Sequence, residues 1–175
     1  MSEPRASETA RALRDAFDRS FAEAIAERPK TTSLLAVRVG GDPYALRLDE
    51  IAALHRDRTI TPAASPLPEL LGMAGFRGLI APVYDLGLLL GYDREKSPRW
   101  LVLIRSAAPV ALAFACFDAH LLVESSRLAS IGSSARPHLD ATLEGPEGSR
   151  PLIRVASLVE AITSKARSLS PKKER

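Results

Sequence analysis

GMAGFRGLIAPVYDLGLLLG, residues 72–91, is the stretch of sequence that is most informative about the fold. It places Arg77, flanked by glycines, directly before an apolar run over residues 79–84 that predicts a β-strand. Pro82 within that run favours an edge or bulged strand, because proline has no backbone N–H to donate. Asp85 follows at the N-cap position of a short apolar helix over residues 86–90. The stretch therefore predicts a turn that carries Arg77, then a strand and a capped helical turn.

The same stretch carries no residue that suggests catalysis, since its turn has no Ser, Cys or His that could act as a nucleophile or base. The three histidines, His55, His120 and His138, have no metal-ligand spacing with one another or with Cys116. Cys116 lies in an apolar run and is predicted to be an inert core thiol. Phosphate-binding glycine loops and the HExxH motif are absent from the sequence. We therefore expect a protein that is not an enzyme and that needs no cofactor or metal.

The composition indicates an ordinary folded protein. The chain has 175 residues, of which 46% are hydrophobic, which is enough for one domain or two small subdomains. One cysteine, no apolar leader and no apolar run of about 18 residues predict a cytoplasmic location. The net charge of +3 arises beyond Thr163, where five basic residues accompany one acid. Residues 167–175 are predicted to be a basic disordered tail, with weak attraction to anionic lipid or nucleic acid as the alternative.

The first 30 residues are predicted to form a separate helical extension. Four apolar side chains, Leu13, Phe17, Phe21 and Ile25, recur every four residues and give the helix one apolar stripe. Pro29 then ends the helix. This stripe either packs on the chain's own domain or docks on a partner protein.

Beyond Pro29 the pattern changes to the period of two that is typical of strands. A hairpin is predicted over residues 35–48 with its turn at residues 40–43. Further strands are expected at residues 51–56, 100–105, 110–123 with a break near residues 117–118, 138–143 and 151–155. Ser157 is predicted to cap a last helix over residues 158–167. Several short strands with Gly and Pro turns indicate a mainly β protein built from barrels or a sandwich.

Three segments in this order resemble the CheW family of bacterial chemotaxis coupling proteins. They are LLAVRVGGDPYALRLDEI at residues 34–51, FRGLIAPVYDLGLLLG at residues 76–91 and LIRVASLVEAI at residues 152–162. The resemblance implies a mainly β fold with two tandem SH3-like β-barrel subdomains and short helices over residues 31–166. The amphipathic helix of residues 1–30 would then be an addition to this fold.

The resemblance also implies a function. CheW proteins are adaptors without enzymatic activity that join the cytoplasmic tip of chemoreceptors to a CheA-type histidine kinase, in arrays at the inner face of the membrane. The runner-up within this class is a divergent member that binds a receptor or a dedicated partner without the kinase. A nucleic-acid-binding barrel is the alternative from another class, but it needs exposed aromatics among basic residues, and only 5% of this chain is aromatic. Self-association is left open.

Partner-binding residues follow from the same resemblance. Arg77 and Phe76 are expected to be anchors, because a guanidinium on a turn can form two charge-assisted bonds with a partner carboxylate or with carbonyls. The alternative is that Arg77 bonds a carbonyl of its own turn. Ala53, Leu54 and His55 lie where family members face the receptor.

This chain departs from the family at some of these positions. Phe76 and Gly75 stand where an Asn is usual, Ala53 and its neighbours stand where an acid is usual, and Ala115 replaces a second acid. Since contact residues determine partner choice more than they determine the core, we expect a conserved fold with an altered binding surface.

Overall fold

The structure is a computed structural model that describes residues 11, 13–17, 30–132, 137–145 and 148–169. The chain divides into two units, Met1–Lys30 and Thr31–Arg175. In the first unit residues 11 and 13–17 are helical, and Leu13 and Phe17 of the predicted stripe are exposed there. Phe21 and Ile25 lie outside the described residues.

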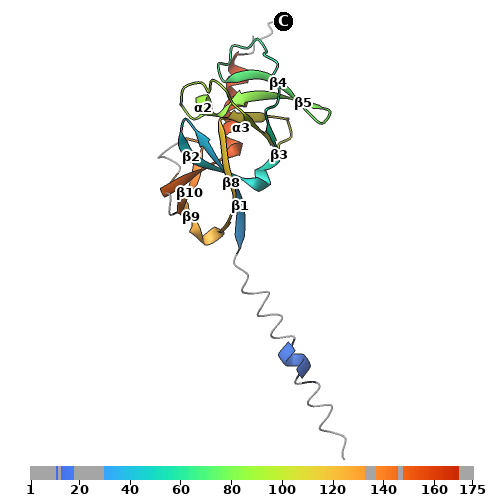
Figure 1. Cartoon of the computed structure of the whole chain (residues 1–175), viewed down its shortest axis with the longest axis vertical. Helices are drawn as coiled ribbons and strands as arrows, with labels where there is room; N and C mark the ends of the chain where they lie inside the picture. The colour runs from blue at the N-terminus through green and yellow to red at the C-terminus, as the bar shows by residue number, and fades with distance from the viewer. Residues whose placement is uncertain (1–10, 12, 18–29, 133–136, 146–147, 170–175) are drawn as a thin grey trace, which may run out of the picture. The chain divides into compact units, whose positions relative to one another are not determined.

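The second unit contains two antiparallel-rich sheets (Figure 1). Sheet A has the strand order β8-β1-β2-β11-β10-β9, and sheet B has the order β3-β6-β7-β5-β4. The strands of sheet A are β1 (Thr31–Val39), β2 (Asp42–Arg47), β8 (Cys116–Glu124), β9 (Leu128–Ser130), β10 (Leu139–Gly145) and β11 (Gly148–Ile153). The strands of sheet B are β3 (Ile51–Arg56), β4 (Leu70–Phe76), β5 (Leu79–Asp85), β6 (Trp100–Ile104) and β7 (Ala111–Phe114). The predicted mainly β architecture is confirmed, and sheet B is inserted between the two parts of sheet A.

Three apolar cores explain why several strands carry consecutive apolar residues. One core lies within each sheet and a third joins the two sheets to the last helix. In β1, for example, Leu34 belongs to the core of sheet A, while Leu35 belongs to the core between the sheets. Because successive side chains of a strand point to opposite faces, a strand buried on both faces needs an unbroken apolar run.

The helices are short. They are η1 (Leu48–Glu50), α2 (Leu86–Leu89), η2 (Ser125–Arg127) and α3 (Val155–Leu169). Asp85 is fully buried and caps α2 as predicted, since its Oδ1 accepts from the Leu88 N–H at 3.2 Å. Its Oδ2 accepts from the Glu95 N–H at 3.0 Å, so one carboxylate holds both α2 and the loop that follows. No helix among the described residues has the length and apolarity needed to cross a membrane.

The last helix differs from its prediction at both ends. It begins at Val155, so the predicted cap at Ser157 is wrong, and the Ser157 hydroxyl instead bonds His138 Nδ1 at 2.8 Å. Val155 is buried with Leu158 and Ile162, and this extra apolar contact accounts for the earlier start. The helix continues to Leu169, three residues into the predicted tail 167–175, and the remainder of that tail lies outside the described residues.

The expectation of an edge or bulged strand was wrong in its first alternative, because β5 lies between β4 and β7. The β4–β5 pairing does have a register shift, between Leu70 and Gly72, and Pro82 is accommodated because the pairing with β7 begins one residue later, at Val83. The expectation for the cysteine was also wrong. Cys116 is exposed rather than a core thiol. The long apolar run is interrupted at Ala115, and β8 begins at Cys116. The side chain of Cys116 lies on the exposed face of this strand.

Candidate partner-binding surface

The tip of the β4–β5 hairpin is a two-residue turn made by Arg77 and Gly78. Phe76 and Leu79 pair across it, and the turn residues have φ values of 48° and 87°. Positive φ at both central residues is typical of a type I′ turn, whose twist matches that of the flanking strands. The turn therefore presents the Arg77 side chain to solvent at the end of the hairpin.

Phe76 lies beneath this turn rather than on the surface. Its side chain is only 3% exposed and belongs to the core of sheet B. The ring contacts the imidazole of His55 on β3, with ring centroids 5.2 Å apart. As a buried residue, Phe76 supports the turn from below and offers a partner little area of its own.

The three predicted residues of β3 are divided between the two faces of the strand. His55 pairs with Leu101 of the sheet B core, and Ala53 is the next residue on the same face. Leu54 faces the opposite way and packs against the core between the sheets. The structure thus brings His55, Phe76 and Arg77 together and directs Leu54 away from them.

The electrostatics of this site connect His55 with the turn. Burial lowers the pKa of His55 below its ordinary value, and the nearby charges of Arg58 and Arg77 lower it further. The imidazole is therefore neutral at neutral pH, and the positive charge beside it belongs to the arginines.

Two exposed apolar residues next to Arg77 were not among the predicted site residues. Leu79 is 41% exposed and Ile80 is 67% exposed. Ile80 pairs with Gly75 on β4, and because glycine has no side chain, nothing on the neighbouring strand covers it. A glycine opposite an isoleucine is the signal in the sequence, but it can be interpreted only once the register of the hairpin is known. Leu79 and Ile80 are successive residues of β5 and so lie on its two faces. Together with Arg77 they surround the tip of the hairpin, and we call these three residues the hairpin surface.

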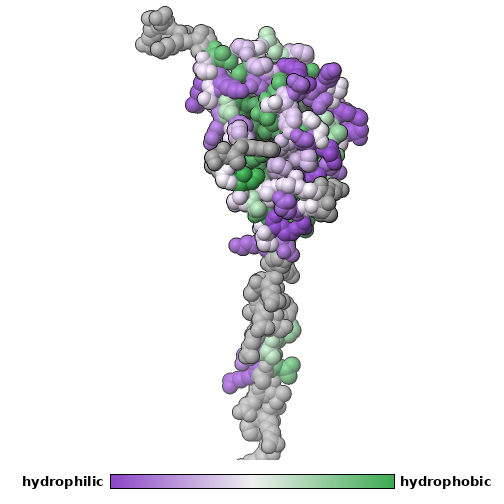
Figure 2. All heavy atoms as spheres, turned by 90° about the vertical axis from the view of Figure 1, so that its left-hand side faces the viewer, coloured by the Kyte–Doolittle hydropathy of each residue, from purple (hydrophilic) through white to green (hydrophobic). Residues whose placement is uncertain are grey.

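A second apolar region lies on the side of the molecule where α2, β2 and β10 are found. Figure 2 shows hydrophobic side chains forming a band across that side, with hydrophilic side chains next to it. A cleft of about 530 Å³ in this region is lined by the end of α2 and its C-cap, residues 88–90, together with Tyr44, Tyr92 and Leu139. The Tyr92 hydroxyl donates to Asp42 Oδ2 at 2.5 Å and bonds the Tyr44 hydroxyl at 2.9 Å, which fixes the edge of the cleft.

Neither region resembles a metal centre. Within the ranges that the structure describes, no group of three or more His, Cys, Asp or Glu side chains is arranged to hold a metal ion. Both regions instead place polar groups beside apolar area, an arrangement that suits protein recognition.

Comparison with known proteins agrees with this geometry. The solved structure of the scaffolding protein TtCheW from Thermoanaerobacter tengcongensis has the same fold, with a TM-score of 0.63 at 15% sequence identity, over 72% of this chain and 89% of that chain. No curated protein sequence matches this chain. The family model of the CheW-like domain matches residues 33–145, which is more than half of the chain and includes the hairpin surface. The protein therefore belongs to the CheW-like domain family.

Proposed function

We propose that this protein is an adaptor without enzymatic activity that couples chemoreceptors to a CheA-type histidine kinase in bacterial chemosensory signalling. Membership of the CheW-like domain family supports this class of function. The observation that carries the proposal is the hairpin surface, where one exposed arginine stands beside two exposed apolar side chains. Such a combination suits a protein interface, because apolar anchors supply contact area and a guanidinium adds directed, charge-assisted bonds.

The backbone at Arg77 supports a binding role for this side chain. A non-glycine residue in the left-handed region is unfavourable by roughly 1 kcal/mol, and asparagine or glycine would fit this turn better. An arginine here therefore lowers folding stability slightly without making a hydrogen bond or ion pair that would offset the cost among the described contacts. A contact with a partner would explain why an arginine occupies position 77.

The apolar members of the hairpin surface also support a binding role. Ile80 has most of its side chain in water at a sheet position where a covering neighbour is missing. Burial of such area in an interface is favourable by about 25 cal/mol per Å². The hairpin surface is therefore the part of sheet B at which we place the partner.

The second part of this proposal concerns the apolar stripe of the N-terminal unit. Its exposed Leu13 and Phe17 belong to this stripe, which either packs on its own domain or docks on a partner. Deleting residues 1–30 distinguishes the two. An insoluble remainder indicates that the helix covers its own domain, whereas a soluble protein that has lost one interaction identifies a docking helix.

The adaptor function is tested by measuring binding of the full chain to a receptor cytoplasmic fragment and to the regulatory domain of the kinase from the same cell. Both are expected to bind, and Arg77→Ala is expected to weaken at least one of them about 30-fold, equivalent to about 2 kcal/mol. Arg154→Ala is the matched control, since Arg154 is exposed and lies directly before α3 rather than on sheet B. Failure to bind either partner, or equal effects of the two variants, contradicts the proposal.

A further inference from the structure

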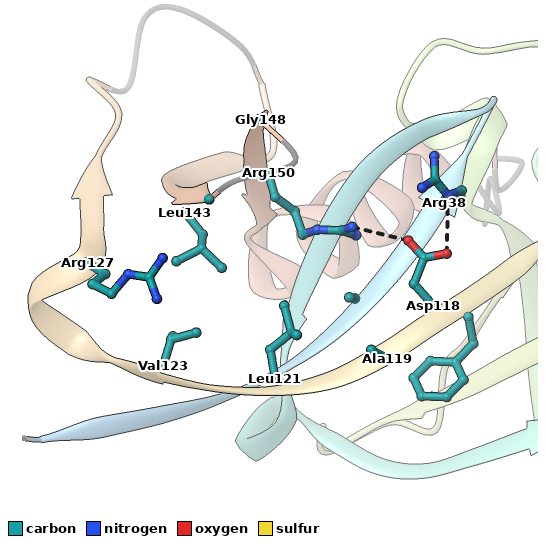
Figure 3. A pocket seen from close by; sticks show the side chains of 12 residues that line it. Arg38, Asp118, Ala119, Leu121, Val123, Arg127, Leu143, Gly148 and Arg150 are labelled. Carbon is teal, nitrogen blue, oxygen red and sulfur yellow. Dashed lines mark hydrogen bonds and ion pairs between the residues drawn. The ribbon is translucent and has the colours of Figure 1, made fainter.

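A cavity of about 650 Å³ opens on the concave side of sheet A, away from the hairpin strands of sheet B (Figure 3). Its walls come from β1, β8, η2, β10 and β11. The cavity exists because the residues at several lining positions are too small to fill it: Ala36, Ala119, Gly145 and Gly148. A volume of this size is in the usual range for small-molecule sites.

The middle of the cavity is apolar. Val123 and Leu143 are buried members of the sheet A core, and Leu121 packs against that core. Figure 3 shows these three side chains between Arg127 at one end and Arg150 with Asp118 at the other. The cavity thus has an apolar floor with charged groups at both ends.

The charges at one end are already paired with each other. Asp118 accepts from Arg38 Nε at 3.2 Å through Oδ1 and from Arg150 Nη2 at 3.2 Å through Oδ2. Arg150 Nη1 also donates to the Tyr44 carbonyl at 3.0 Å, so its guanidinium is held in place. This end fixes the shape of the cavity and leaves no unneutralised acid in it.

At the other end, Arg127 has no acidic partner among the described residues. Arg127 Nη2 donates to the Glu144 carbonyl at 2.9 Å, and none of the described carboxylates forms an ion pair with this guanidinium. The lining residues as a whole include three arginines and one carboxylate. The lining residues therefore carry a net positive charge, and Arg127, which no described carboxylate pairs, lies next to the apolar floor.

We propose that this cavity binds a small organic anion that has an apolar body and one carboxylate. The carboxylate pairs with Arg127, where a guanidinium offers charge-assisted hydrogen bonds, and the apolar body lies along Leu121, Val123 and Leu143. A neutral ligand of the same shape leaves Arg127 without its counter-ion, and a hydrophilic anion leaves the apolar floor in water. The site is independent of the hairpin surface and would add a ligand to a protein that otherwise binds proteins.

The test is an NMR titration of the full chain with sodium octanoate and, separately, with 1-octanol. Octanoate is expected to give saturable shifts at the lining residues, with an affinity at least tenfold higher than that of octanol. Arg127→Gln should reduce octanoate affinity about tenfold, as the loss of one charge-assisted bond of about 1.4 kcal/mol implies, and should leave octanol binding unchanged. The matched control is Arg58→Gln, which removes an exposed arginine that does not line the cavity and should change neither probe.

A second variant tests the volume rather than the charge. Ala119→Leu places a larger apolar side chain in the cavity and should abolish binding of both probes, with an unchanged melting temperature showing that the fold is intact. Equal affinities for octanoate and octanol, an unchanged octanoate affinity in Arg127→Gln, or shifts confined to residues outside the cavity would each overturn the proposal.

Discussion

The imidazole of His55 packs against the ring of Phe76, with centroids 5.2 Å apart and planes inclined by 52°. His55 belongs to β3 and Phe76 to β4, and these strands stand at opposite ends of the strand order of sheet B. The contact therefore joins the two edges of a curled sheet directly below the turn that carries Arg77. Arg77 also lowers the pKa of His55, so the turn and this contact are electrostatically linked.

The lowered pKa of His55 predicts a pH dependence of folding. Burial, Arg58 and Arg77 disfavour the imidazolium in the folded state, whereas the unfolded chain takes up a proton near the ordinary value of 6.5. The stabilising contribution is thus complete above about pH 6.5 and is lost as pH falls through the folded-state pKa. The pKa of His138 is lowered in the same direction, by burial and by Arg154 and Lys165.

Urea unfolding between pH 5 and 8 should therefore show a free energy of unfolding that falls below pH 6.5, with a smaller slope in His55→Phe. An NMR titration of the His55 ring gives the pKa directly. A pKa at or above 6.5 would refute the assigned environment.

Replacing Arg77 with asparagine should separate stability from binding. The Asn-Gly pair is favoured in type I′ turns, so Arg77→Asn is expected to raise the free energy of unfolding by about 0.5–1 kcal/mol. Loss of the nearby positive charge should also raise the pKa of His55 toward its ordinary value. Partner affinity should fall at the same time. A variant that is less stable than the parent would show that Arg77 makes a structural contact within its own unit.

Local patterns predicted much of this fold correctly. The strands β1 and β2, the glycine turn between them and the Asp85 cap each depend on neighbours a few residues away, and each is found where the sequence places it, although β1 and β2 are buried on both faces rather than on alternate residues. The site could be predicted only in part. Arg77 lies on a turn as expected, because a glycine pair around a short turn is itself a local signal, whereas its place at the tip of the β4–β5 hairpin was not predicted.

Long-range contacts account for what was missed. Phe76 was expected as a surface anchor, but closure of sheet B against His55 buries it, and that contact joins residues 21 positions apart. Exposure of Ile80 depends on its pairing with Gly75 and hence on the strand register. Cys116 became exposed because the apolar run divides at Ala115 into strands of different sheets. None of these facts is present in a window of adjacent residues.

Gly75 has free space around the position of a Cβ, so we expect a substitution there to stabilise the fold and to weaken binding. A Cβ built on Gly75 meets no atom within 4 Å, so Gly75→Val should fit, cover part of Ile80 and raise the free energy of unfolding by about 0.5–1 kcal/mol. Covering Ile80 should weaken partner binding measured by calorimetry.

Gly72→Val on the same strand is the matched control for this substitution. Gly72 has a φ of 149°, and a Cβ there would lie 2.1 Å from the Thr61 carbonyl oxygen. Because the added side chain would clash with the backbone and strain it, the free energy of unfolding should fall by several kcal/mol. Similar melting temperatures for the two variants would contradict the described register of β4.

Asp85 should be the polar residue whose loss damages the fold most clearly. Its fully buried carboxylate accepts from the backbone N–H groups of Leu88 and Glu95, and Asp85→Ala leaves both donors without this acceptor. We expect a loss of about 2–3 kcal/mol in the free energy of unfolding by urea, with Asp93→Ala, an exposed control in the same loop, within about 0.5 kcal/mol of the parent. Asp85 is the last residue of β5, and both of its bonds hold the segment that follows. Hydrogen exchange in Asp85→Ala should therefore show faster opening of α2 and the following loop before β4 and β5 separate. Equal stability of the two variants would mean that water replaces the carboxylate at both donors and that the cap does not hold α2.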